Sequence, residues 1–95
     1  MFGFGVNVND VVEYQEKAIA IEAMMAELAK QGLIAPTSNN KRICNTNYNN
    51  ITFLTDCLNS GQMPGKAVFW AVRKTVDINL NTVQSMVNRL KPEFA

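Results

Sequence analysis

The residues of this chain with the most recognisable binding chemistry lie near its C-terminal end, in and around the stretch DINLNTVQSMVNRL, residues 77–90. Asn and Gln side chains can hydrogen-bond adenine through two atoms, and Ser and Thr hydroxyls bond base edges more loosely. Arg and Lys side chains contact phosphates. In a helical register these polar side chains share an outward face that carries no acid. The candidate DNA-binding residues are Asn81, Thr82, Gln84, Ser85, Asn88, Arg89, Lys91, Arg73 and Lys74.

Catalytic and metal-binding chemistry has little support in the sequence. The chain has no histidine, which removes the commonest general acid or base and the commonest metal ligand. Its two cysteines, Cys44 and Cys57, are too few for a four-ligand zinc site. The sequence contains no converging acid pair and no phosphate-binding glycine loop between a strand and a helix. We therefore expect no enzyme activity, no cofactor and no metal site.

The length and composition indicate one small domain. Ninety-five residues can bury a modest core, and 47% of them are apolar, as in ordinary globular chains. No apolar run approaches the ~20 residues of a transmembrane helix, and the N-terminus lacks the pattern of a signal peptide. We therefore expect a cytoplasmic protein with reduced thiols and no membrane contact.

The charges are unevenly distributed along the chain. Residues 1–31 hold five acids against two basic residues, whereas residues 32–95 hold seven basic residues against three acids. An acidic first part and a basic remainder fit a protein that offers one face to an anion, although a random surface produces the same asymmetry.

The N-terminal third of the chain predicts an extended arm followed by a long helix. Residues 1–9, MFGFGVNVN, alternate between apolar side chains and Gly or Asn, which is the period of a strand. Because glycine weakens a strand, we predict only a short arm there. Residues 10–31 predict a long amphipathic helix that Asn9 caps and that Gly32 ends in the left-handed conformation.

One face of that helix is apolar at a spacing of three and four residues. A stripe of this width packs against two neighbouring helices of the same chain, or it forms the contact between two copies of the chain. In the second case, the oligomer interface consists of Val11, Tyr14, Ala18, Ile21, Met25 and Leu28.

The middle of the chain is unusually rich in asparagine. Six of its 12 asparagines lie within residues 39–50. Because Asn favours turns and caps, we predict a loop over residues 33–46 and a helix over residues 47–59, with Cys57 in the core and Gly61 as the stop. The sequence Met63-Pro64-Gly65 marks the next boundary. We expect the tryptophan that follows, Trp70, to anchor the core.

Residues 70–90 resemble the helix-turn-helix of DNA-binding domains. That motif holds two helices across a tight turn through a few apolar positions. The positions that match are Val72, Val76, Ile78, Val83 and Met86. The resemblance implies a helix pair over residues 66–76 and 80–91, of which the second helix reads DNA. Arg73 departs from the motif, which has a small residue there, and Asp77 departs from the glycine that usually begins the turn.

A single continuous helix explains the same stretch. Seven residues fall on an unbroken spacing of three and four, namely Phe69, Val72, Val76, Asn79, Val83, Met86 and Leu90. Against continuity stand Asp77, Asn79 and Asn81, which are poor residues for a helix interior. We therefore predict a break near residues 77–81. The expected fold is a mainly α, small four-helix domain with a short extended N-terminal arm.

Two functions follow as hypotheses. The first is a dimeric helix-turn-helix protein that binds duplex DNA, acting as a transcriptional regulator. The second is a non-enzymatic protein-interaction module, either a small helical oligomer or an inhibitor of a host protein of the kind that phages and mobile elements encode. The wide apolar stripe of the first helix and the Phe-Gly arm motivate the second hypothesis.

Overall fold

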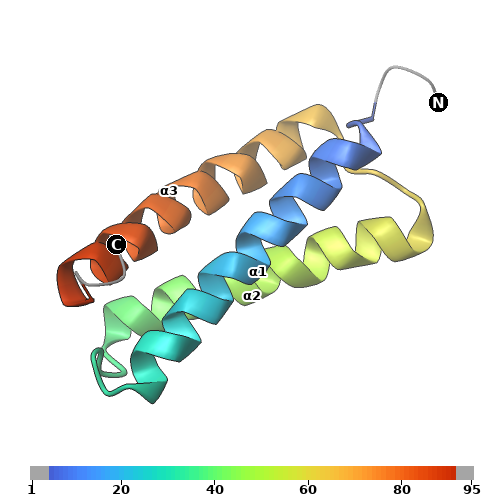
Figure 1. Ribbon diagram of the computed structural model, residues 1–95. Helices are drawn as coiled ribbons and strands as arrows, with labels where there is room; N and C mark the ends of the chain where they lie inside the picture. The colour runs from blue at the N-terminus through green and yellow to red at the C-terminus, as the bar shows by residue number, and fades with distance from the viewer. Residues whose placement is uncertain (1–4, 92–95) are drawn as a thin grey trace.

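The chain folds into three long α-helices, as a computed structural model that describes residues 5–91 shows (Figure 1). They are α1 (Val8–Lys30), α2 (Ser38–Ser60) and α3 (Lys66–Leu90). Helices α1 and α3 run in the same direction and α2 runs against both. Helix α1 packs on both neighbours, whereas α2 and α3 contact each other much less. No helix within residues 5–91 is long and apolar enough to cross a membrane.

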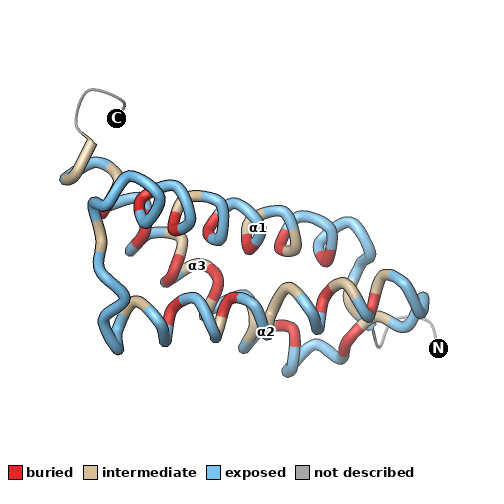
Figure 2. The backbone as a smooth tube through the Cα atoms, turned by 90° about the horizontal axis from the view of Figure 1, so that it is seen from below, coloured by how far each residue is buried: buried red, intermediate tan, exposed pale blue. Residues whose placement is uncertain are grey.

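The core lies where the three helices face one another (Figure 2). The buried apolar side chains are Val11, Tyr14, Ala18, Ile21, Met25, Leu28, Ile43, Leu54, Cys57, Phe69, Val76, Val83 and Met86. All six residues predicted as an oligomer interface are among them, so that assignment is corrected. Because α2 and α3 both pack on α1, the stripe of α1 is covered within a single chain. The alternative interpretation, a helix packed on two neighbours, describes this fold.

Helix α1 begins two residues earlier than predicted. Its cap is Asn7, whose side chain accepts a hydrogen bond from the backbone N–H of Asn9 at 2.8 Å. At the other end Gly32 has a φ of 71°, the left-handed conformation expected of it. Of the predicted arm, residues 1–4 lie outside the described residues. The described part forms one antiparallel bridge between Gly5 and Gly65.

The asparagine-rich segment is helical, so the predicted loop over residues 33–46 is confirmed for residues 33–37 and wrong for residues 38–46. Helix α2 starts at Ser38 because Thr37 caps it, accepting a hydrogen bond from the N–H of Asn40 at 3.2 Å. Two residues of the segment then turn into the core, Ile43 and Asn47. Asn47 donates from Nδ2 to the carbonyl oxygen of Ala18 at 2.6 Å, so tertiary contacts hold the segment against its turn preference. Gly61 ends α2 at a φ of 76°, as predicted.

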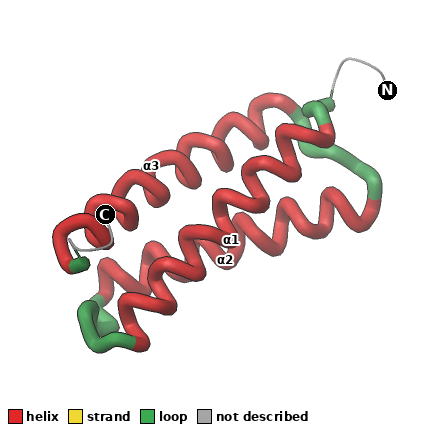
Figure 3. Tube along the Cα trace, in the orientation of Figure 1, coloured by secondary structure: helices red, strands yellow, loops and turns green. Residues whose placement is uncertain are grey.

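Helix α3 is one uninterrupted helix, so the predicted break and the four-helix count are wrong (Figure 3). The residues spaced by three and four all face inward: five of the seven are buried, and Val72 and Leu90 pack at the edge of the core. Asp77, expected to begin a turn, instead lies in the helix and accepts a hydrogen bond from the hydroxyl of Tyr14 at 3.2 Å. Residues 70–90 therefore do not form a helix-turn-helix.

Candidate interaction surface on the third helix

The nine candidate DNA-binding residues lie on α3 or directly after it. Eight are exposed, and Lys91, which follows the helix, is half-buried. Because α3 is continuous, the residues from Arg73 to Lys91 spread over about 27 Å at 1.5 Å per residue. The structure thus brings them onto the uncovered side of one helix, but it does not gather them on a short helix that projects from the domain.

Two apolar residues stand out on the same side of α3. Trp70 and Ile78 are each 59% exposed, although Trp70 was expected in the core and Ile78 in a turn. Phe69 takes the core position instead and meets the ring of Tyr14 edge-on, with ring centroids 5.7 Å apart. The spacing that places Phe69 and Val76 inward also places Trp70 and Ile78 outward, and this was the signal available in the sequence.

Trp70 and Ile78 belong to a row of side chains spaced by four or three residues along the outward face. We call this row the α3 stripe; its members are Trp70, Lys74, Ile78, Asn81 and Ser85, all exposed. The ammonium of Lys74 lies 4.7 Å from the centroid of the Trp70 ring, within the range of a cation–π contact. The stripe therefore combines an apolar surface with a positive charge held against it.

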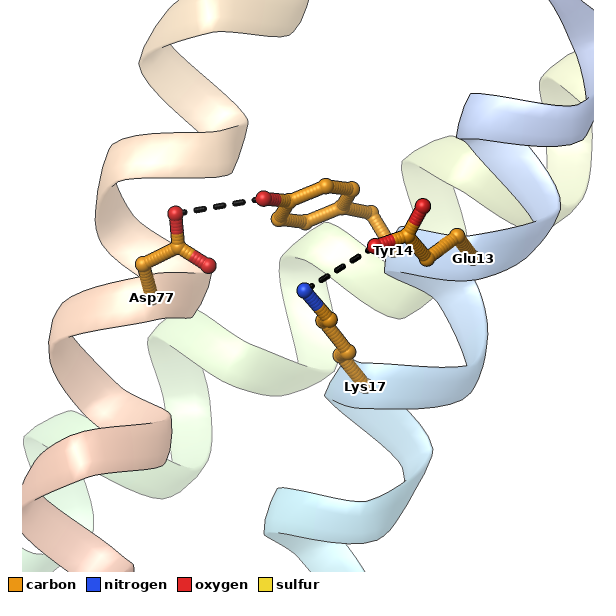
Figure 4. A network of polar contacts seen from close by, with 4 residues as sticks. All are labelled: Glu13, Tyr14, Lys17 and Asp77. Carbon is orange, nitrogen blue, oxygen red and sulfur yellow. Dashed lines mark hydrogen bonds and ion pairs between the residues drawn. The ribbon is translucent and has the colours of Figure 1, made fainter.

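A cluster of polar contacts joins α3 to α1 beside the stripe (Figure 4). Tyr14 reaches from α1 to the carboxylate of Asp77, and Lys17 pairs with Glu13 at 3.0 Å. The guanidinium of Arg73 lies 5.2 Å from the centroid of the Tyr14 ring. The contacts of Tyr14 with Asp77 and Arg73 therefore link α1 to α3.

The same cluster holds two cations in their charged forms. The pKa of Arg73 is raised, chiefly by its contact with Tyr14 and further by the nearby carboxylates of Asp77 and Asp10. The pKa of Lys17 is raised first by its hydrogen bond to Glu13. Arg73 is thus positioned against α1 by its contact with the Tyr14 ring.

The charge of the helices differs sharply. Helix α3 carries four basic residues and one acid, Asp77, whereas α1 carries five acids and two lysines. The helices therefore have net charges of +3 and −3 and lie side by side in one chain. A basic face on α3 and an acidic face on α1 remain open to solvent.

The thiols, the acidic side chains and a second hollow are weaker candidates for a functional site. Cys44 is exposed and Cys57 is buried, both as free thiols, and burial raises the pKa of the Cys57 thiol. Within residues 5–91 no group of three or more Cys, Asp or Glu side chains is arranged to hold a metal ion. An open hollow of about 570 Å³ lies between α1, the α1–α2 loop and the start of α2.

Comparison with known proteins finds no match for this chain among protein-family models, curated proteins or solved structures.

Proposed function

We propose that this protein is a non-catalytic interaction module that assembles with further copies of itself through exposed helix faces. The exposed pair of Trp70 and Ile78 in the α3 stripe carries the proposal. Trp is among the residue types most enriched at the energetic centres of protein interfaces. Covering this pair removes apolar surface from water, and the adjacent cations supply a polar rim.

A complementary surface lies on α1 of the same chain. Val8, Val12 and Ile19 are exposed there, at a spacing of four and seven residues that places them on one side of the helix. We call these three residues the α1 stripe. Its helix carries a net −3, and exposed acids such as Glu16 lie beside the stripe. The α1 stripe of one copy and the α3 stripe of another therefore match in apolar character and in charge.

A contact of this kind joins two different surfaces, so each pair of copies leaves one α1 stripe and one α3 stripe unused. Heterologous contacts of this type continue into rings or open chains. The proposal therefore predicts an association that grows with concentration beyond a dimer. Because the matching charges are exposed, added salt weakens the association without abolishing its apolar part.

Sedimentation equilibrium of the purified chain tests the proposal. The unmodified protein is expected to associate reversibly at micromolar to millimolar concentration. Trp70→Ala is expected to weaken the association by about tenfold or more, as removal of a central anchor does. Ile19→Ala in the α1 stripe is expected to weaken it as well. Tyr48→Ala is the matched control, because Tyr48 is an exposed aromatic residue that belongs to neither stripe.

A mixing experiment then identifies the pairing of the stripes. Trp70→Ala retains an intact α1 stripe, and Ile19→Ala retains an intact α3 stripe. Mixing the two variants is expected to form heterodimers that neither variant forms alone. If two α3 stripes paired with each other, Ile19→Ala would form dimers on its own, and mixing it with Trp70→Ala would add none. A monomeric unmodified protein would overturn the proposal entirely.

Duplex DNA is the second candidate partner, and the exposed basic and amide side chains of α3 favour it. Arg89, Asn88 and Gln84 lie in the last two turns of the helix, on its solvent side. Fluorescence anisotropy of a labelled random-sequence duplex at low and moderate salt measures this binding. Steeply salt-dependent binding, lost when these three residues are changed to Ala, would support a DNA-binding function. Absence of binding at low salt would exclude it.

A further inference from the structure

A cavity of about 310 Å³ lies where α1 and α3 begin, and it shares Trp70 with the α3 stripe. Four of its lining residues precede or start α1, and four lie in the first two turns of α3. They are Gly5, Val6, Asn7, Asp10, Lys66, Phe69, Trp70 and Arg73. The bridge between Gly5 and Gly65 ties the two walls together, as does the hydrogen bond from the N–H of Val6 to the carbonyl of Pro64 at 3.3 Å.

The cavity combines aromatic surface with positive charge. Phe69 is buried beside it, whereas the indole of Trp70 is mostly exposed. The ammonium of Lys66 makes no ion pair within residues 5–91, so its charge is available to a ligand. Arg73 adds a guanidinium that its contact with Tyr14 already positions.

The helix ends next to the cavity add to the positive potential. Both α1 and α3 begin at this end of the molecule, so the positive ends of two helix dipoles point the same way. The cap residue of α3, Gly65, offers no side-chain acceptor to the first N–H groups of the helix. One carboxylate, that of Asp10, opposes the two cations of the lining.

We propose that this cavity binds a small aromatic anion, with the ring stacked on the indole of Trp70 and the acidic group held by Lys66 and Arg73. A nucleoside monophosphate has this chemistry. A base stacked on an aromatic side chain contributes about 1–3 kcal/mol, and a phosphate accepts charge-assisted hydrogen bonds from Lys and Arg. A volume near 300 Å³ lies at the lower end of the range for small-molecule sites.

The fluorescence of Trp70 reports binding directly, because it is the only tryptophan of the chain. Adenosine monophosphate is expected to quench this fluorescence saturably. Adenosine and inorganic phosphate, which each carry half of the chemistry, are expected to bind at least about tenfold more weakly. Equal binding of all three probes, or no quenching by adenosine monophosphate, would overturn the proposal.

Charge variants test the assigned residues in opposite directions. Lys66→Ala is expected to weaken binding of adenosine monophosphate by about tenfold, since it removes a charged partner. Asp10→Asn is expected to strengthen binding, because the opposing carboxylate is lost. Arg89→Ala is the matched control, since it removes one positive charge from the far end of the same helix. A loss with Arg89→Ala equal to that with Lys66→Ala would show unspecific attraction and overturn the site.

Two further experiments distinguish binding at this site from other causes of a change in Trp70 fluorescence. Titration of the Ile19→Ala variant, whose cavity is unchanged, distinguishes ligand binding from self-association. A 5′-phosphorylated trinucleotide distinguishes the end of a nucleic acid from a free nucleotide. Tighter binding of the trinucleotide assigns the cavity to strand ends, equal affinity assigns it to free nucleotides, and both results support it. Failure of the trinucleotide to bind at all, with its phosphate and base both present, would count against the assigned contacts.

Discussion

Helices α1 and α3 run side by side in the same direction, yet Ile21 of α1 and Ile78 of α3 lie in opposite environments. Ile21 of α1 is fully buried, whereas Ile78 of α3 is 59% exposed. Both helices follow a spacing of three and four residues, and Ile21 falls on that spacing while Ile78 falls beside it. Register within the helix, rather than the hydrophobicity of the residue, decides which isoleucine enters the core. The apolar residues that register leaves outside are the ones available for binding.

The largest expected effect is the loss of stability when the buried isoleucine, Ile21, is truncated. Ile21→Ala is expected to lower the free energy of unfolding by about 2–5 kcal/mol, because it removes a buried side chain and leaves a cavity. Ile78→Ala is expected to change it by no more than about 0.5 kcal/mol, as exposed substitutions do. Urea denaturation of both variants, followed by circular dichroism, measures the difference. Equal losses would show that Ile78 is also buried.

The two asparagines Asn47 and Asn49 sharpen the same contrast within α2. Asn47→Ala is expected to lower the free energy of unfolding by about 1 kcal/mol, because the hydrogen bond to the Ala18 carbonyl is lost. The same change also removes the buried Oδ1 of Asn47, which has no hydrogen-bond partner, and this limits the loss. Asn49 is exposed, so Asn49→Ala is expected to stabilise the helix slightly through its higher helix propensity. Chemical denaturation of the two variants measures both changes in the free energy of unfolding. A stabilised Asn47→Ala would mean that α2 does not use this residue to pack on α1.

Asp77→Gly distinguishes a continuous α3 from a helix-turn-helix. In a continuous helix this change removes the acceptor for Tyr14 and adds backbone freedom, so a loss of about 1–2 kcal/mol is expected. In a turn, glycine would fit better than aspartate and would stabilise the protein. The sign of the change in the thermal unfolding temperature therefore separates the two structures. Asn81→Gly is a second variant in the same region.

The smallest expected effect concerns the two thiols. A disulfide reagent under native conditions is expected to react rapidly with exposed Cys44 and slowly with buried Cys57. Because burial raises the pKa of Cys57, the folded chain keeps that proton when the unfolded chain loses it. Stability is thus unaffected by this group at neutral pH and falls above about pH 8.5, where free thiols ionise. Cys57→Ala should remove that part of the alkaline loss, and Cys44→Ala should not.

Strong local signals in the sequence predicted most of α1, the end of α2 and both ends of the α3 segment. The left-handed glycines Gly32 and Gly61 stop α1 and α2 where expected, and α3 begins at Lys66 as predicted. The nine candidate DNA-binding residues were placed correctly on the exposed side of the C-terminal segment, with Lys91 only partly exposed. Their use in binding remains a prediction.

The sequence interpretation failed where local preference and tertiary packing disagreed. Asn79 and Asn81 each cost at most about 0.7 kcal/mol in a helix relative to Ala, and so do the asparagines of α2. Burying Val76 and Val83 contributes about 1.5–3 kcal/mol each, which outweighs those costs and keeps α3 continuous. Trp70 stays exposed, against expectation, because the neighbouring residue Phe69 takes the inward position of the spacing.

The sequence alone determined that the chain is mainly helical, that α1 carries a buried stripe, and which residues of α3 share a side. These features depend on spacing and on capping residues, which act within a few residues of one another. Only the tertiary structure decided that residues 38–46 and 77–81 are helical, that α1 is covered by its own chain, and that Trp70 stays in water. These outcomes depend on which surfaces come into contact when the three helices pack. Patterns that span only a few residues do not give the free energy of that contact.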